Sequence, residues 1–217
     1  CMRYIEVHEL MQTHIHVVAK TAYFHALSLG VLPSKLRFIA NGVDTEIFRP
    51  GAKSDYLHSI VDIAPETPLI GYIGRLSPEK GPEVFIQVAG KVHKKQANCH
   101  FVLVGEGPMQ EKLENEINIL GLGDWIHFAG LQSDMSRVYS SLDLAVSTSY
   151  SEGMPLAIIE AMASGIPVVA TNVGGVSDIV VVGCTGLLHS VGDLDGLPNG
   201  SATLRSSSSS QQASRPG

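Results

Sequence analysis

The stretch PLIGYIGRLSPEKGPEVFIQVAGKVHKK, residues 68–95, contains one strand, one helix and a charged loop between them. Residues 68–74 form a short apolar run that ends in glycine, which is typical of a buried strand. In residues 81–95, three valines recur four residues apart: Val84, Val88 and Val92. This spacing places them on one face of a helix. The stretch therefore predicts a strand followed by an amphipathic helix.

The same alternation continues to residue 172. Further apolar runs predict strands over 100–105, 125–130, 144–149 and 167–172, and the segments between them predict helices over 108–119, 134–141 and 155–163. These strands are apolar almost throughout, so helices must cover both faces of their sheet. We predict an α/β fold with a Rossmann-like, doubly wound parallel sheet. The last helix should bury its apolar residues at spacings of three and four, Leu156, Ile159 and Ala163.

The two flanks of this pattern differ from it. We expect residues 1–40 to be the remnant of a preceding N-terminal domain, because two strand-like segments there enclose a helix-like one. Residues 41–67 would be a linker, and 68–196 a single Rossmann-like domain. Residues 197–217 are Ser-rich and have no apolar periodicity, so we expect a disordered tail. The chain is thus expected to be truncated at both ends.

Composition narrows the class of protein. A formal net charge of −6 and a pI near 5.8 argue against nucleic-acid binding, which needs a cationic face to displace counterions. No apolar run approaches the roughly 20 residues that span a bilayer, and no secretory signal is evident. Three widely spaced cysteines, Cys1, Cys99 and Cys184, suit reduced thiols better than disulfides. We expect a cytoplasmic protein without transmembrane segments.

Charged loops follow two of the predicted strands, at the sheet edge where open α/β folds bind ligands. The loop GRLSPEKG, residues 74–81, holds Arg75 and Lys80 between glycines. Two cations in one loop can clamp a diphosphate. The alternative is a solvated loop in which Pro78 and Gly81 only start the next helix.

Two glutamates, Glu152 and Glu160, lie eight residues apart around the start of the helix predicted over 155–163. Pro155 suits the first helical position, so Glu152 would lie in the loop above the helix and Glu160 on its second turn. Carboxylates near a helix N-terminus that attracts anions suit sugar or ribose hydroxyls. The alternative is a helix-terminal charge and an ordinary surface residue. The functional interpretation predicts a phosphate-bearing sugar as ligand.

Several of these motifs occur together in a known family. SEGMPLAIIEAMASGIPVVAT followed by GG, with GYIGRLSPEKG, VGEGP and NGVD, resembles the C-terminal, donor-binding half of retaining glycosyltransferases of family 4, also called glycosyl transferase group 1, which have the GT-B fold. The similarity covers roughly residues 13–192. The motifs stand in the family's order at similar spacing, which makes a chance match of the whole set improbable.

The resemblance implies a role for each matching residue. Arg75 and Lys80 would hold the donor diphosphate, Glu152 would meet the donor sugar, and these three would form the catalytic set. Glu160 would bind the ribose hydroxyls. The remaining donor-binding residues would be Gly153, Met154 and Leu156, whose stretch approaches the sugar and phosphate, and Leu131, in a loop that faces the base. Pro155 replaces an amide donor of many members, so one hydrogen bond to the ligand would be missing.

The expected function is retaining transfer from a nucleoside-diphosphate sugar, linked to UDP, GDP or ADP, to a glycan, lipid or small-molecule acceptor. We expect no cofactor and no metal. The family's acceptor domain has no counterpart in this sequence, so half of the catalytic cleft would be absent. One alternative is therefore a non-catalytic nucleotide-binding fragment. Another is a nucleotide-sugar epimerase of the same fold, although the segment with the paired glutamates matches the transferases more closely.

Overall fold

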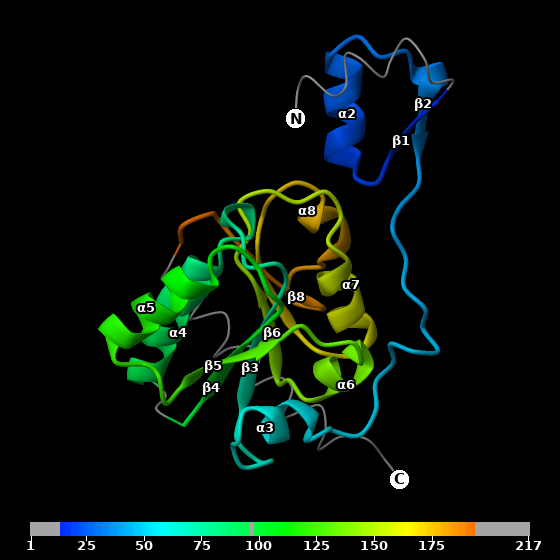
Figure 1. The fold of residues 1–217 in the computed structure, drawn as a ribbon. Helices are drawn as coiled ribbons and strands as arrows, with labels where there is room; N and C mark the ends of the chain where they lie inside the picture. The colour runs from blue at the N-terminus through cyan, green and yellow to red at the C-terminus, as the bar shows by residue number, and fades with distance from the viewer. Residues whose placement is uncertain (1–13, 96–97, 194–217) are drawn as a thin grey trace.

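The computed structural model of this 217-residue chain describes residues 14–95 and 98–193. A small N-terminal unit adjoins the α8 end of a larger α/β domain, and an extended segment also connects the two (Figure 1). The tail over 197–217, which we expect to be disordered, lies outside the described residues, and so does Cys1. The candidate site is built on the α/β domain.

The α/β domain is built around one six-stranded sheet. Its strands are β3 (Leu69–Ile73), β4 (His100–Val104), β5 (Ile126–Gly130), β6 (Leu144–Ser147), β7 (Val168–Thr171) and β8 (Gly186–His189). They lie in the order β5-β4-β3-β6-β7-β8, and every neighbouring pair is parallel. In chain order, β3, β4 and β5 therefore extend the sheet to one side, and β6, β7 and β8 extend it to the other side. This confirms the predicted doubly wound parallel sheet.

Helices cover both faces of the sheet (Figure 1). One face carries α4 (Pro82–Lys95) and α5 (Gln110–Leu120), and the other carries α3 (Tyr56–Ile60), α6 (Met135–Ser140), α7 (Leu156–Ala163) and α8 (Val176–Ile179). Each face has its own apolar core. The valines Val84, Val88 and Val92 all lie buried on α4, which confirms the helix face predicted from their spacing.

The predicted orientation of α7 is wrong. Its buried residues are Ile158 and Ala161, whereas Leu156 is 47% exposed. Seven of the eight residues in LAIIEAMA are apolar, so the helix has no single apolar stripe, and packing against the sheet selects the face that is buried. The helix also begins one residue later than expected. Pro155 precedes it as the N-cap residue, with an extended backbone at φ −73° and ψ 117°.

Three elements of the domain have no counterpart in the predicted pattern: α3, α8 and β8. The edge strand β8 has only four residues and is only partly buried. Helix α3 lies within residues 41–67, the segment expected to be a linker. Its Leu57 is fully buried in the core beneath α6, and the Leu57 amide donates to Ser141 Oγ at 3.2 Å. This part of the segment therefore packs as a component of the α/β domain.

The N-terminal unit is a small βαβ arrangement. Strands β1 (Ile15–Val17) and β2 (Leu36–Phe38) pair in parallel, with α2 (Lys20–Ser28) and a 3₁₀ turn (Pro33–Lys35) between them. Its own core consists of three buried residues, Ala26, Val31 and Leu36. The unit contacts the α/β domain where the Lys20 amide, at the start of α2, donates to Asp178 Oδ2 at 2.9 Å.

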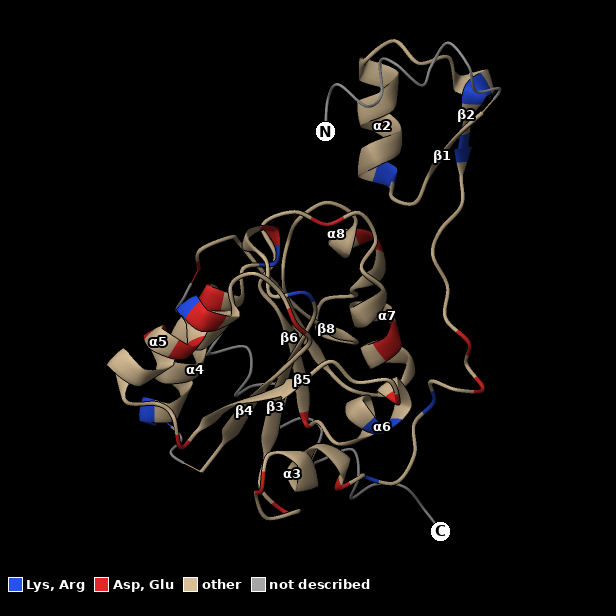
Figure 2. Cartoon of the chain, in the orientation of Figure 1, with Lys and Arg blue, Asp and Glu red and all other residues tan. Residues whose placement is uncertain are grey.

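The charges, cysteines and helix lengths of the described residues relate to the expectations drawn from composition. Acidic residues lie along α5 (Figure 2). Of the cysteines in the described residues, Cys99 is buried, Cys184 is exposed, and both are free of disulfides. In residues 14–95 and 98–193, no helix has the length and apolar character needed to cross a membrane.

Candidate functional site

The site lies where the sheet reverses its direction of construction, at the carboxyl ends of β3 and β6. These two strands are neighbours, with Tyr72 opposite Val146 in the register. Their loops are bonded to one another: Thr148 Oγ1 donates to the Gly81 carbonyl at 2.7 Å, and the Tyr150 amide donates to the Glu79 carbonyl at 2.9 Å. Open α/β sheets bind ligands at such a switch point. The two loops therefore form one wall of a preformed site.

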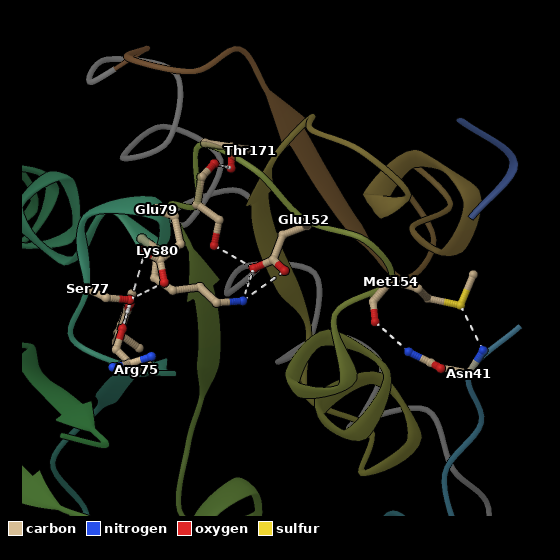
Figure 3. A network of polar contacts seen from close by, with 10 residues as sticks. Asn41, Arg75, Ser77, Glu79, Lys80, Glu152, Met154 and Thr171 are labelled. Carbon is tan, nitrogen blue, oxygen red and sulfur yellow. Dashed lines mark hydrogen bonds and ion pairs between the residues drawn. The ribbon is translucent and has the colours of Figure 1, made fainter. Parts of the chain in front are cut away.

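An ion pair joins the two loops (Figure 3). Lys80 Nζ lies 2.8 and 2.9 Å from the two carboxylate oxygens of Glu152. The Glu152 side chain is only 8% exposed, and that of Lys80 is 32% exposed. The predicted phosphate-binding cation and the predicted sugar-binding carboxylate thus neutralise each other here. The separate roles assigned to these residues do not anticipate this contact.

Further hydrogen bonds hold the Glu152 carboxylate in place. Ser149 Oγ donates to Glu152 Oε1 at 2.7 Å, and the Ser149 carbonyl accepts a bond from Thr171 Oγ1 at 2.6 Å (Figure 3). The loops after β3 and β6 therefore meet at the Glu152 side chain, and the end of β7 supports them through Ser149. Ser149 and Thr171 were not predicted as site residues, because a lone serine or threonine after a strand has no distinctive pattern.

The paired glycines after β7 explain why that loop comes so close. Gly174 has a φ of +54°, and a Cβ added there would overlap the carbonyl oxygen of Glu152. The next amide, of Gly175, donates to the Gly153 carbonyl at 2.8 Å. A side chain at position 174 would be strained and would also push the Glu152 loop away.

Arg75 and Leu131 line a shared pocket beside the ion pair. The pocket has a volume of about 400 Å³. Its walls come from the ends of β3, β4 and β5 and from α6: Ile73, Gly74, Arg75, Val104, Gly105, Glu106, Leu131, Gln132 and Met135. Arg75 is exposed and Leu131 is 74% exposed. The pocket is mostly apolar, with the cation Arg75 and the carboxylate Glu106 among its lining residues. Such a pocket suits a flat, uncharged group.

A tyrosine on β3 holds the backbone of the Arg75 loop by a hydrogen bond. The hydroxyl of Tyr72 donates to the Arg75 carbonyl at 3.0 Å. Burial, and secondarily the charge of Glu152, raise the pKa of Tyr72 well above its usual range. The hydroxyl therefore stays protonated and remains a donor at physiological pH.

Glu160 lies on α7 and contacts a different partner. Tyr139 on α6 donates its hydroxyl to Glu160 Oε2 at 2.7 Å. Glu160 is half-buried and does not line the pocket. Helix α6 connects the two, because it carries both Met135, which lines the pocket, and Tyr139, which bonds to Glu160. Tyr139 was not predicted as a site residue, since a fully buried tyrosine on a short helix looks like an ordinary core residue.

The other predicted residues lie around the start of α7. Gly153 is exposed, and Leu156 is 47% exposed on the first turn. The Met154 side chain is buried instead: its sulfur accepts from the Asn41 amide at 3.2 Å, and its carbonyl accepts from Asn41 Nδ2 at 2.8 Å (Figure 3). Met154 thus ties the connection from the N-terminal unit to the Glu152 loop.

The predicted site residues thus fall into three groups. The structure brings Lys80 and Glu152 into contact, brings Arg75 and Leu131 to one pocket, and gives Glu160 a separate partner. Across residues 14–95 and 98–193, no group of three or more His, Cys, Asp or Glu side chains is placed to hold a metal ion.

Comparisons with known proteins place this geometry in context. The family model for glycosyl transferases group 1 matches residues 55–214. A D-inositol 3-phosphate glycosyltransferase of Mycobacterium sp. (strain KMS) is 34% identical over 189 residues, which are 80% of this chain and 42% of that protein. A sulfoquinovosyl transferase of Arabidopsis thaliana is 36% identical over 168 residues, 75% of this chain and 31% of that protein. The chain thus spans less than half the length of these relatives.

Solved structures share the fold. The crystal structure of a mutant of S. aureus TarM in complex with fondaparinux, α-GlcNAc-glycerol and UDP has a TM-score of 0.82 at 25% identity, over 94% of this chain and 39% of that one. The C-terminal domain of a Francisella tularensis glycosyl transferase group 1 protein (LpcC) has a TM-score of 0.68 at 30% identity, over 77% of this chain and 90% of that one. The second match shows that this fold occurs as one domain within a longer protein.

Proposed function

The chain belongs to the glycosyl transferases group 1, and we propose that its α/β domain binds the nucleoside-diphosphate sugar donor at the switch point between β3 and β6. The observation that carries this proposal is the contact between Lys80 and Glu152, from the loops after β3 and β6, together with Arg75 of the Lys80 loop, which lines a pocket at the end of β3. A domain with the same fold has been crystallised with UDP, which makes UDP the first nucleotide to test.

Each part of the donor has a matching environment in the proposed complex. The base enters the pocket lined by Leu131, and Arg75 at the pocket rim meets the diphosphate. Lys80 lies between the diphosphate and Glu152, which accepts hydroxyls of the sugar. Glu160 accepts the ribose hydroxyls. Charged groups that bind at fixed positions lose little freedom on binding, so this preformed arrangement favours affinity.

The chemistry of transfer then depends on the leaving diphosphate. As the bond between the sugar and the diphosphate breaks, negative charge accumulates on the diphosphate oxygens. Cations fixed beside it, Arg75 and Lys80, stabilise that transition state more than the ground state. We propose retention of configuration, and membership of family 4, from the similarity of the paired-glutamate segment. The acceptor would be held by a preceding domain, to which we assign residues 1–40 as its remnant.

A second candidate function is nucleotide binding without transfer. The observation behind it is the ion pair between Lys80 and Glu152, which occupies the two groups assigned to the diphosphate and the sugar. Transfer and binding are separated by incubating the chain with radiolabelled UDP-, GDP- and ADP-sugars and measuring sugar transfer and donor hydrolysis. Binding of the donor without either product would favour this second function.

The donor site itself is tested by calorimetric titration of UDP, GDP and ADP. A charge-assisted hydrogen bond contributes about 1.5–3 kcal/mol, so Arg75→Ala should weaken the preferred nucleotide by roughly one to two orders of magnitude. Arg49→Ala is the matched control, because it removes an exposed arginine from the segment that connects the N-terminal unit to α3. Equal affinities for the Arg75 variant and the unaltered chain would place the diphosphate elsewhere.

A further inference from the structure

We propose that Tyr139 is a positioning residue for the donor: its hydroxyl orients Glu160 so that one carboxylate oxygen is directed to the ribose. The inference rests on the proposed donor site and adds a residue to it. It begins from the hydrogen bond of 2.7 Å between the Tyr139 hydroxyl and Glu160 Oε2.

The fold holds the Tyr139 side chain in one position, so its hydroxyl can orient the Glu160 carboxylate. Its side chain is fully buried in the core between the sheet and helices α3, α6 and α7. Phe48 packs against the ring edge-to-face, with ring centroids 5.9 Å apart. In a close-packed core such a ring occupies one rotamer, so the position of its hydroxyl is fixed by the fold. The half-buried glutamate on α7 gains a fixed orientation from this contact.

The chemistry of the pair leaves capacity for a ligand. An ionised carboxylate only accepts hydrogen bonds, whereas a phenol donates one. Tyr139 uses Oε2, which leaves Oε1 for the hydroxyls of a ribose. Burial, followed by the bond to Glu160, raises the pKa of Tyr139 far above physiological pH. The hydroxyl therefore remains a donor throughout the working range.

Helix α6 places this pair at a defined distance from the base pocket. Met135 lines the pocket, and Tyr139 follows it four residues later on the same helix. Residues four apart on a helix are neighbours on one side, with Cβ atoms about 6 Å apart. One helix thus contributes to the wall for the base and to the support for the ribose-binding carboxylate. This spacing suits a nucleoside, whose base and ribose are directly bonded.

The test compares two nucleotides on one variant. Calorimetry with Tyr139→Phe would use whichever of UDP, GDP and ADP binds most tightly, together with its 2′,3′-dideoxy analogue. Loss of a hydrogen bond to a charged group should weaken the ribonucleotide about five- to tenfold. The dideoxy analogue has no ribose hydroxyl to lose, so its affinity should change less than about twofold. A structural role would weaken both nucleotides equally, and that outcome would overturn the proposal.

Two further variants separate positioning from general damage. Tyr23→Phe removes a tyrosine hydroxyl from α2 in the N-terminal unit, outside the proposed donor site, and should affect neither nucleotide. In the background of Glu160→Gln, adding Tyr139→Phe should have less than about a twofold further effect on the ribonucleotide, because the charged partner is already gone. A further loss as large as that of Tyr139→Phe alone would contradict the proposed coupling.

The outcomes also distinguish this inference from the proposed function. If the unaltered chain binds none of the three nucleotides, the donor site itself is wrong. If it binds a ribonucleotide with a loss for Arg75→Ala but does not distinguish the dideoxy analogue, the donor site stands and the role of Tyr139 falls. Thermal unfolding of Tyr139→Phe checks that the variant is folded; should it unfold, the Glu160→Gln variant tested with both nucleotides still decides whether this carboxylate meets the ribose.

Discussion

Glu152 and Glu160 flank the first turns of one helix, yet they are held by different chemistry. Glu152 is nearly buried, pairs with the Lys80 ammonium and accepts from Ser149. Glu160 is half-buried and accepts from the neutral hydroxyl of Tyr139. A carboxylate paired with a cation competes with any other anion that the cation binds, whereas one paired with a hydroxyl does not. The two glutamates should therefore respond in opposite ways to a bound diphosphate.

The largest effect that separates the two carboxylates is expected from Gly174→Ala. A Cβ there would overlap the Glu152 carbonyl and would occupy a left-handed backbone conformation. Strain and overpacking together should lower the free energy of unfolding by about 2–4 kcal/mol, measured by urea denaturation. Gly183→Ala is the control, since its φ is +79° but the space around it is open, so it should lose only about 1 kcal/mol. Similar losses would mean that contact with the Glu152 loop contributes little.

Lys80→Ala should cause the next largest loss in the free energy of unfolding. It leaves the Glu152 carboxylate, 8% exposed, without its cation. Because water reaches Lys80, we expect a loss of about 1–3 kcal/mol in unfolding free energy, rather than that of a fully enclosed pair. The double variant Lys80→Ala/Glu152→Gln should recover part of the loss.

Lys53→Ala provides the matched comparison for that measurement. It breaks the pair with Asp143, in which the side chains are 41% and 30% exposed, and should lose about 0–1 kcal/mol. If Lys80→Ala destabilises the protein no more than Lys53→Ala, the ion pair at the site contributes no more than an ordinary surface pair.

Neutralising each carboxylate should change nucleotide affinity in opposite directions. Glu152→Gln frees Lys80 for the diphosphate, so the preferred nucleoside diphosphate should bind about two- to fivefold more tightly. Glu160→Gln weakens the contact with the ribose and should reduce the affinity about tenfold, at least as much as Tyr139→Phe. Calorimetry of both variants under identical salt conditions provides the comparison. Glu79→Gln, which removes a charge from the same loop but not from the Lys80 pair, is the control. A change of the same sign in both would contradict the difference between the two sites.

A pair of histidines far from the two glutamates should also make the free energy of unfolding depend on pH. His100 Nδ1 and His127 Nε2 share a hydrogen bond of 2.9 Å near the amino ends of β4 and β5. Burial, followed by neighbouring histidines, lowers the pKa of each. The folded state therefore favours the neutral rings, and the unfolded state binds more protons below about pH 6.5.

The difference in bound protons determines how the free energy of unfolding changes with pH. The stabilising contribution of the neutral pair is present above about pH 6.5 and is lost as the pH falls through the folded pKa values. We expect a small decrease in the free energy of unfolding over that range, which His127→Gln should reduce and the exposed control His25→Gln should not. An unchanged pH dependence in His127→Gln would assign the decrease to other groups.

The positions of the strands and helices could be predicted from local patterns. Apolar runs and valines spaced four residues apart depend on residues close in sequence, and they located β3, α4 and the alternation that follows. The charged loops were also predictable, because parallel strands bring their carboxyl ends to one edge. The orientation of α7 was not, because almost every position of that helix is apolar.

The order of the strands was not contained in those patterns, and the contacts of the site depend on it. Lys80 meets Glu152 across 72 residues because β3 pairs with β6, and Tyr139 meets Glu160 because α6 and α7 cover the same face. Local spacing determined which residues reach the edge of the sheet, since periodicity acts over a few residues. Pairing and packing between distant segments decided which of them touch, because hydrogen bonds and ion pairs require atoms about 3 Å apart.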